Sequence, residues 1–419
     1  MVNLLTRIKK NSLTQGLYRR LNFYAFSRSL NQITPLAVRK SRHDFRRLNL
    51  VIPSINREHT FGGISTALQL YRGLVRELGD NVLRRIIVTD YAPGKGDLAD
   101  FGDYSQVGWD DDSDDAGQIL PANFRSGHTM PVCRGDVYLT TQWITAYLAQ
   151  RSAAAQADLF GTAPKRIGYL IQDYEPGFYP YSTDHVLCES TYRSSVPQVA
   201  VFNSSFLHDF FKGQGYAFES EYSFEPRLNS RLKEMLTSPD RPAKKRQILV
   251  YGRPSTPRNA FPLLLEGLRL WAGPQWKDWQ IFSAGEQHPD VPLGHGMTLR
   301  SLGKLSLEQY ADLLHQSAVG VSLMISPHPS YPPLEMAHFG ALTVSNSFAS
   351  KNLATWHDNI LSIDRCTPEV VAEVIAGQCS RFISDPGCGL RGRSRAPGYL
   401  EDSTVFGFLP QLARDLFVE

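Results

Sequence analysis

Two arginines and a glutamate in the second half of this 419-residue chain have the types and spacing that a sugar nucleotide requires. Arg253 follows Gly252 at the end of an apolar run, Arg258 comes five residues later, and Glu335 stands three residues after Pro332. Guanidinium groups stay charged and hold phosphates in bidentate fashion, whereas a carboxylate accepts hydrogen bonds from hydroxyls. We therefore expect a diphosphate on the arginines and sugar or ribose hydroxyls on Glu335. The alternatives are a solvated basic turn and an acid that only stabilises a helix dipole.

A pair of glycines, Gly62 and Gly63, marks a second candidate site in the first half of the chain. They follow an apolar strand-like run and lead directly into a helical stretch. Glycines let the backbone approach a ligand closely, and a helix N-terminus offers free N–H groups to a phosphate. The turn predicts a contact with the same ligand, and a plain strand-to-helix connection is the alternative.

These residues need a framework that brings them together, and the apolar pattern predicts alternating strands and helices around parallel sheets. In the first half we expect strands at 48–52, 85–89, 136–140, 166–171 and 198–202 and helices at 64–78, 143–157 and 206–213. In the second half we expect strands at 247–251, 279–283, 299–302, 319–323, 341–344 and 359–363 and helices at 261–271, 307–315, 333–339, 369–383 and 405–418.

A polar, proline-bearing segment at 238–246 separates the two halves, as a domain boundary should. The predicted fold class is therefore α/β, with two Rossmann-like domains that face each other across a cleft, at 48–237 and 247–395. Open α/β sheets bind ligands at the carboxyl ends of their strands, where the glycine pair and the arginines are expected.

The net charge of +3 hides a strong asymmetry. Residues 1–47 contain eleven Lys and Arg and one acid, a formal +10, so the remainder carries 3 minus 10, or −7. The main body is therefore not expected to bind nucleic acid. Within the basic extension, Leu13, Leu17, Leu21 and Tyr24 have helical spacing. Two interpretations stay open: a helix packed on the protein's own body, or peripheral contact with an acidic membrane surface.

The cysteines, the acidic segments and the hydropathy of the chain argue against a disulfide framework, a metal site and a membrane span. The five cysteines form an odd set without CxxC spacing, which favours a reducing, cytoplasmic location over a disulfide framework. No apolar run is long enough for a membrane span. The aspartate-rich segment 110–115 lacks the Gly and terminal Glu of a calcium loop, and no HExxH motif occurs. We expect neither a metal nor another cofactor.

Together these motifs resemble retaining GT-B glycosyltransferases of family four. More narrowly, the segments 169–176, Tyr-Leu-Ile-Gln-Asp-Tyr-Glu-Pro, and 322–337, which ends in Pro-Pro-Leu-Glu-Met-Ala, are similar to bacterial rhamnosyltransferases of the WsaF type. The likeness runs from about residue 48 to the C-terminus. It implies an acceptor domain at 48–237, a nucleotide-sugar domain at 247–395 and a segment at 396–419 that crosses back to the first domain. Residues 1–47 lie outside the likeness, and their own apolar spacing predicts a helical extension.

The resemblance also implies roles for particular residues. Catalytic roles would fall to Asp173, which would face the sugar or the acceptor hydroxyl, and to Arg253 and Glu335. In donor binding, Arg253 and Arg258 would bind the diphosphate, and Lys304 would add a third cation. Tyr331 would pack on the base or sugar, and Glu335 would bind the ribose hydroxyls. Gly62 and Gly63 would form the glycine turn against the donor.

One departure from the broad family bears on the choice of sugar. That family usually has a second glutamate eight residues before the first-turn acid, and this chain has Pro327 there. Loss of a hydroxyl acceptor is consistent with a 6-deoxyhexose, and the resemblance to rhamnosyltransferases implies which one. We therefore predict transfer of L-rhamnose from dTDP-L-rhamnose to a glycan or lipid-linked glycan in bacterial surface polysaccharide assembly. The alternatives are a GT-B nucleotide-sugar epimerase and a non-catalytic glycan-binding relative.

Overall fold

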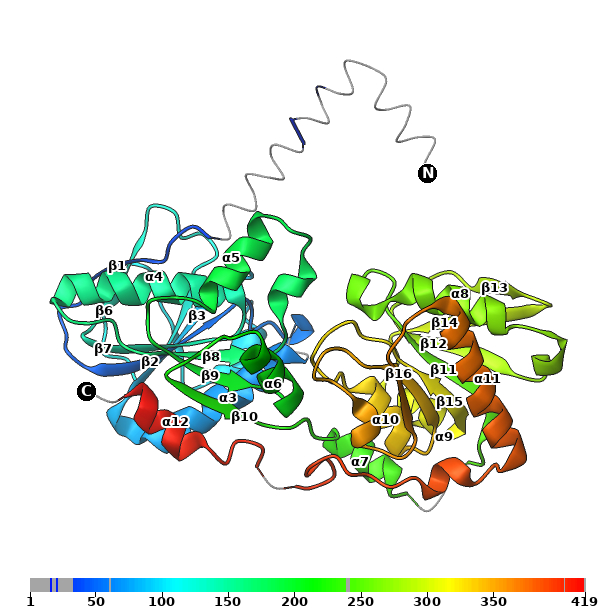
Figure 1. The fold of residues 1–419 in the computed structure, drawn as a ribbon. Helices are drawn as coiled ribbons and strands as arrows, with labels where there is room; N and C mark the ends of the chain where they lie inside the picture. Colours follow the sequence, from blue (N-terminus) through cyan, green and yellow to red (C-terminus); the bar gives the residue numbers. More distant parts are fainter. Residues whose placement is uncertain are drawn as a thin grey trace.

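The computed structural model describes residues 16, 20–21, 33–59, 62–238, 242–402 and 404–417. It contains two α/β domains, each built on its own sheet (Figure 1). The predicted fold class, two Rossmann-like domains, is confirmed.

The first domain has an eight-stranded parallel sheet. In spatial order its strands are β10 (Ser220–Ser223), β9 (Gln198–Phe202), β8 (Ile167–Ile171), β7 (Gly135–Thr140), β2 (Arg46–Ile52), β3 (Leu83–Val88), β5 (Gly117–Pro121) and β4 (Ser105–Gln106). A separate parallel pair consists of β1 (Ala37–Lys40) and β6 (Thr129–Val132). The helices are α3 (Gly63–Leu78), α4 (Trp143–Phe160), α5 (Thr183–Thr191), α6 (Ser205–Gly213) and the short turns η1 (Arg57–His59), η2 (Gly79–Asn81), η3 (Asp97–Phe101) and η4 (Glu175–Phe178).

The second domain has a seven-stranded sheet in which only the edge pair of β13 and β14 is antiparallel, within the described residues. In spatial order its strands are β13 (Val291–Gly294), β14 (Met297–Gly303), β12 (Gln280–Gly285), β11 (Lys245–Gly252), β15 (Ser317–Val321), β16 (Leu342–Asn346) and β17 (Ile360–Ile363). Its helices are α8 (Phe261–Trp271), α9 (Leu307–Gln316), α10 (Pro332–His338), α11 (Pro368–Ser384) and the turns η5 (Pro257–Asn259), η6 (Pro274–Trp276), η7 (Leu353–Thr355) and η8 (Cys388–Arg391).

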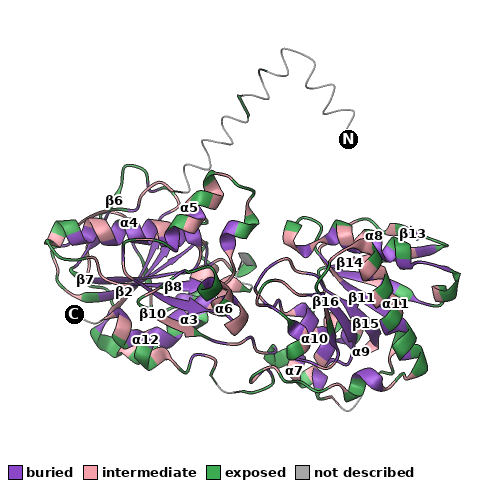
Figure 2. Ribbon diagram, viewed as in Figure 1, coloured by how far each residue is buried: buried purple, intermediate pink, exposed green. Residues whose placement is uncertain are grey.

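The burial of the strands explains why some of them could be predicted from the sequence and others could not. Helices cover both faces of a parallel sheet, so its central strands are almost continuously apolar. Strands β8, β9, β15 and β16 are buried along their whole length, as the purple strands in Figure 2 show. Between residue 48 and the C-terminus, every expected strand and helix is present, most with slightly shifted ends, and the last helix is shorter than expected, at 409–416 instead of 405–418. Several of the strands that were not expected are short or partly exposed, for example β4, β10 and β13, whereas β5 is buried at four of its five positions.

The end of the basic extension differs from the helix predicted over 1–47. Residues 37–40 form β1, and β2 already begins at Arg46. Leu36 is buried in the core beside α4, where its carbonyl accepts a hydrogen bond from Ser152 Oγ at 2.9 Å, so this stretch is extended rather than helical. The earlier part of the prediction lies outside the described residues, except for residues 16, 20 and 21, which are helical. Each helix in the described ranges is too short or too polar to span a bilayer.

The chain crosses between the domains twice. Helix α7 (Ser230–Leu236), placed in the first domain by the predicted boundary at 237, instead packs on the second, since Leu232 and Leu236 share a core with Leu249 and Leu314. Helix α12 (Leu409–Leu416) returns to the first domain and packs against α3. The two crossing segments run together: Leu228 N donates to the carbonyl of Tyr399 at 3.0 Å.

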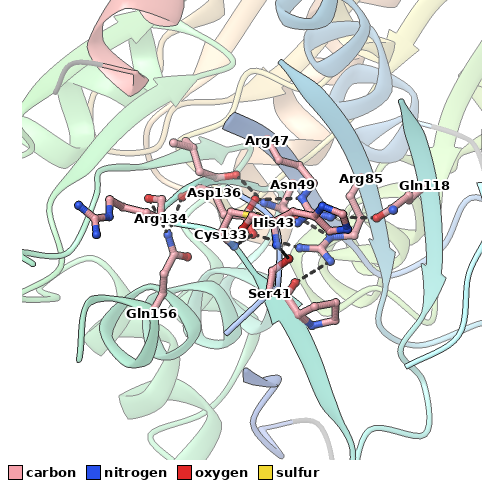
Figure 3. A network of polar contacts seen from close by, with 12 residues as sticks. Ser41, His43, Arg47, Asn49, Arg85, Gln118, Cys133, Arg134, Asp136 and Gln156 are labelled. Atoms are coloured by element: carbon pink, nitrogen blue, oxygen red, sulfur yellow. Dashed lines mark hydrogen bonds and ion pairs between the residues drawn. The ribbon is translucent and has the colours of Figure 1, made fainter. Parts of the chain in front are cut away.

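A buried carboxylate holds the amino-terminal edge of the first sheet together (Figure 3). Asp136, at the start of β7, accepts hydrogen bonds from Arg47 of β2 at 2.9 Å and from Arg85 of β3 at 3.3 Å. All three side chains are at most 2% exposed. Arg47 also donates to Gln118 of β5, and Arg85 to Asn49. Burial, together with the neighbouring Arg47, lowers the pKa of Arg85 to about 10.

Asp136→Asn is expected to lower the free energy of unfolding by about 3–5 kcal/mol, because two buried guanidiniums would lose their counter-charge. Urea unfolding followed by circular dichroism measures the change. The control is Asp100→Asn, the same substitution in a carboxylate that pairs with Arg57 on the surface, where ion pairs contribute little. Equal effects of the two substitutions would contradict the role assigned to Asp136.

Candidate functional site

A cavity of about 470 Å³ lies between the two domains. Its walls come from the loops that follow β2, β7, β8 and β9 in the first domain and β11 and β15 in the second, which is the edge where open α/β sheets bind ligands. The first-domain wall consists of Pro53, Gly62, Gly63, Ile64, Thr66, Thr141, Gln142, Gln172, Asp173, Glu175, Phe178 and Asn203, and the second-domain wall of Arg253, Arg258, Met324, His328 and Tyr331.

The glycine turn lies where close approach is needed. Gly62 has a φ of 49°, a left-handed conformation that a side chain disfavours. A Cβ on Gly63 would come within 2.9 Å of the Gln172 side chain. Gly62 therefore permits the turn into α3, and Gly63 lets the start of α3 lie against the loop after β8. Residues 60 and 61 of the motif lie outside the described ranges.

The arginine loop after β11 is fixed by a buried asparagine. Asn259, 0% exposed, accepts a hydrogen bond from Arg253 N at 2.7 Å and donates to the carbonyls of Tyr251 at 3.1 Å and Leu323 at 3.3 Å. The Arg258 carbonyl in turn accepts from Ile325 N at 2.8 Å. The loops after β11 and β15 thus form one unit, which sets the backbone from which both guanidiniums extend.

Asp173 connects the two walls. Its Oδ2 accepts from the Arg258 guanidinium, and its Oδ1 accepts from Ser326 Oγ and, at 2.8 Å, from Tyr174 N. The Asp173 side chain is 14% exposed and that of Arg258 is 26% exposed, so this ion pair is largely shielded from water. Phe178 adds a third contact, since the Arg258 guanidinium lies 3.7 Å from the centre of its ring.

The loop between β15 and α10 presents a histidine to the cavity. Ser330, at a φ of 65°, donates from its backbone N to His328 Nδ1 at 3.0 Å, so the ring proton is assigned to Nε2. Burial lowers the pKa of His328 to about 4, which keeps the ring neutral. Nε2 is buried without a hydrogen-bond partner among the described residues, so it offers an N–H to a ligand.

The remaining candidates lie at different distances from this centre. Tyr331 lines the cavity. Glu335 lies one turn further along α10 and accepts from the Tyr310 hydroxyl at 3.0 Å, while burial raises its pKa to about 7. Lys304 is exposed after β14. Neither Glu335 nor Lys304 is among the described residues that line the cavity, and their roles stay predictions, as do those of the other candidates.

Several residues of the cavity wall were not singled out by the sequence: Gln142, Gln172, Glu175, Phe178, Asn203 and His328. Each follows a strand at the carboxyl edge of its sheet. Gln172, Glu175 and His328 also lie within the segments 169–176 and 322–337 that carry the family resemblance. Within the described part of the chain, no group of three or more His, Cys, Asp or Glu residues is arranged to hold a metal ion.

Two family models match the chain, one for each domain. The model described as the N-terminal domain of WsaF matches residues 47–205. The model described as the C-terminal domain of WsaF matches residues 246–376. Together they cover more than half of the chain.

Among curated proteins, the O-antigen biosynthesis protein RfbC of Myxococcus xanthus is 29% identical over 244 residues, which is 58% of this chain and 18% of that protein. The chain thus spans less than a fifth of that relative. Two solved structures share the fold at low identity. The glycosyltransferase WaaG, involved in lipopolysaccharide biosynthesis, has a TM-score of 0.53 at 10% identity over 89% of this chain and 100% of its own. Anabaena HepE in complex with UDP has a TM-score of 0.50 at 10% identity over 88% and 95%.

Arg258→Ala is expected to weaken binding of inorganic pyrophosphate at least tenfold, because a charged hydrogen bond contributes about 1.5–3 kcal/mol. Asp173→Asn is expected to strengthen it several-fold, since it removes a negative charge beside the anion and releases Arg258. Isothermal titration calorimetry measures both constants, with Arg269→Ala on the exposed face of α8 as the control. If Asp173→Asn weakened pyrophosphate binding as much as Arg258→Ala does, the prediction would be wrong, and the Asp173–Arg258 ion pair would be required for binding.

Proposed function

The chain belongs to the WsaF family, and from this we propose that it is a glycosyltransferase of bacterial surface polysaccharide assembly that moves L-rhamnose from dTDP-L-rhamnose to a saccharide acceptor. The observation that carries the proposal is the pair Arg253 and Arg258 on one wall of a cavity of about 470 Å³ whose opposite wall is rich in neutral hydrogen-bonding groups. A cationic wall fits a diphosphate, and a wall of amides and hydroxyls fits sugar hydroxyls.

The names of similar proteins agree with this assignment. RfbC is described as an O-antigen biosynthesis protein and WaaG as a glycosyltransferase of lipopolysaccharide biosynthesis, and HepE was solved with UDP bound. We extend these descriptions to the present chain as a nucleoside-diphosphate sugar donor and a glycan or lipid-linked glycan acceptor. Peripheral membrane contact through residues 1–47 rests on their positive charge and on the helical spacing of Leu13, Leu17, Leu21 and Tyr24, and flotation with acidic vesicles measures it.

We propose that the sugar is transferred with retention of configuration and without a metal. Arg253 and Arg258 would stabilise the charge that develops on the departing diphosphate, and the cavity walls would hold donor and acceptor in the reacting orientation. Tyr331 would pack on the base or sugar. Glu335 would accept hydrogen bonds from the ribose, and Lys304 would add a cation when the domains close.

The choice of rhamnose rests on the loop between β15 and α10. Pro327 is buried there and offers no side-chain acceptor at the position where the broad family usually has a glutamate. A sugar with fewer hydroxyls has less need of that acceptor, and leaving a sugar hydroxyl without a partner in a closed site costs free energy. A 6-deoxyhexose is therefore favoured over glucose or mannose.

Arg253→Ala is expected to reduce rhamnosyl transfer by at least a hundredfold while leaving the thermal midpoint of unfolding within the range of Arg269→Ala. Removing one well-placed group that stabilises transition-state charge typically costs two to three orders of magnitude, about 2.7–4 kcal/mol. The assay follows transfer from dTDP-L-rhamnose to a rhamnan acceptor. Near-normal turnover of the variant would overturn the role of the arginine. Isomerisation of the donor without acceptor would favour an epimerase, and binding without transfer a glycan-binding relative.

The nucleotide is tested separately by thermal shift. A ligand that binds only the native state raises the unfolding temperature, and at a hundred times its Kd it contributes about 2.7 kcal/mol. We expect dTDP to raise the midpoint more than UDP or GDP at equal concentration, and the Arg253→Ala variant to lose most of that increase. A larger shift with UDP or GDP would contradict the thymidine assignment.

A further inference from the structure

The two acids on the first-domain wall, Asp173 and Glu175, lie two residues apart but in different surroundings. Both oxygens of Asp173 are occupied, by Arg258 on one side and by Ser326 and Tyr174 N on the other. Three of the roughly four lone-pair sites of this carboxylate are therefore used by protein donors, two of which come from the second domain.

Glu175 lines the same cavity and is only 6% exposed. Its Oε2 accepts a hydrogen bond from Trp143 N, in the first turn of α4, at 3.0 Å. That N–H is the one hydrogen-bond donor that the described part of the chain supplies to this carboxyl. A partner for the second oxygen is therefore to be sought in the cavity, among the groups of a ligand.

Charge balance indicates the protonation state of Glu175. The nearest cation, Arg258, is paired with Asp173, so a carboxylate at Glu175 would be a second buried negative charge without a cation of its own. Burying an ionised carboxyl in that situation costs more than the N-terminus of α4 returns. Burial raises the pKa of Glu175 to about 8; the Trp143 N–H opposes this rise, the charge of Asp173 adds to it, and Arg258 opposes it.

The other ionisable groups that face Glu175 do not change this balance between pH 5 and 8. They lie on β8, on the segment after η4, on α5 and just after α5, and burial raises the pKa of each: Tyr169, Tyr179, Cys188 and Tyr192. All four therefore stay neutral through this range, and Glu175 is the group that titrates.

We propose that Glu175 is a neutral carboxylic acid that donates a hydrogen bond from its second oxygen to an uncharged hydroxyl of the acceptor sugar. The neighbouring wall fits such a ligand, because Thr141, Gln142, Gln172 and Asn203 are all neutral and able to donate or accept. Glu175 is thus an acceptor-binding residue, whereas Asp173 and the arginines serve domain closure and the donor. The assignment of the ligand as an acceptor sugar rests on the proposed function; the protonation state does not.

The protonation state is tested by comparing the thermal midpoints of wild type and Glu175→Gln from pH 5 to pH 8. An acid whose folded pKa is raised from 4.5 to about 8 keeps its proton in the folded state and loses it on unfolding, so wild-type stability falls as pH rises through this window. Glutamine has no proton to lose. The midpoint of the variant relative to wild type should therefore rise steadily toward pH 8. The control for the substitution itself is Glu77→Gln, at an exposed position of α3, and the rise in Glu175→Gln should exceed any change in this control.

The role in binding is tested by kinetics. Glu175→Gln presents a neutral donor and acceptor of the same shape, so the acceptor KM should stay within about threefold of wild type. Glu175→Leu removes both functions and should raise the acceptor KM at least tenfold with an unchanged donor KM. An equal loss in the glutamine and leucine variants, or an unchanged acceptor KM in the leucine variant, would overturn the binding role.

The two tests separate the inference from the proposed function. A midpoint difference that stays flat from pH 5 to 8 would overturn the neutral acid whatever the enzyme does. Absence of transfer by wild type from every sugar nucleotide would remove the proposed function and with it the sugar ligand, and the thermal comparison would still decide the state of Glu175.

Discussion

The first domain depends on one buried carboxylate. Asp136 joins β7 to β2 through Arg47 and to β3 through Arg85, and the same arginines reach β5 and Asn49. Two cations and one anion in the interior are costly unless every hydrogen bond is made, and here the guanidiniums are held by side chains and by the Pro131 carbonyl. This network holds together the amino-terminal ends of the strands. At their carboxyl ends the strands continue into irregular loops. Those loops form the cavity wall.

The cavity itself shows how one type of side chain takes different roles in different surroundings. Asp173 and Glu175 are neighbours in sequence, but Asp173 lies against a guanidinium of the second domain and Glu175 lies against the end of α4. The first accepts hydrogen bonds from Arg258, Ser326 and Tyr174 N, while burial raises the pKa of the second and favours its protonated form. Across from them, Asn259 sets the backbone of the arginine loop, so the cationic wall has a rigid base.

The sequence predicted the framework well because parallel strands such as β8 and β15 are buried on both faces and read as apolar runs. It also indicated Gly62, Gly63, Arg253 and Arg258, whose residue types carry a clear chemistry and which all line the cavity. It could not indicate the protonation of Glu175 or His328, since burial in the folded protein is the main cause of both pKa shifts. Strand β1 was missed because residues 1–47 were predicted to be a helical extension from the apolar spacing at 13–24. Leu36, just before β1, is instead buried beside α4, a contact with a distant part of the chain.

The double crossing of the chain has a mechanical consequence. A body tied to another by a single flexible segment turns about any axis, but here two segments run side by side, joined by the Leu228–Tyr399 hydrogen bond and by the ion pair of Lys233 with Asp402. Two adjacent ties resist twisting and sliding more than they resist bending. We therefore infer that the domains open and close by bending about these two paired segments. Such a motion would bring Arg258 back to the same position opposite Asp173 at each closure. Reproducible alignment of the two walls is thus built into the path of the backbone.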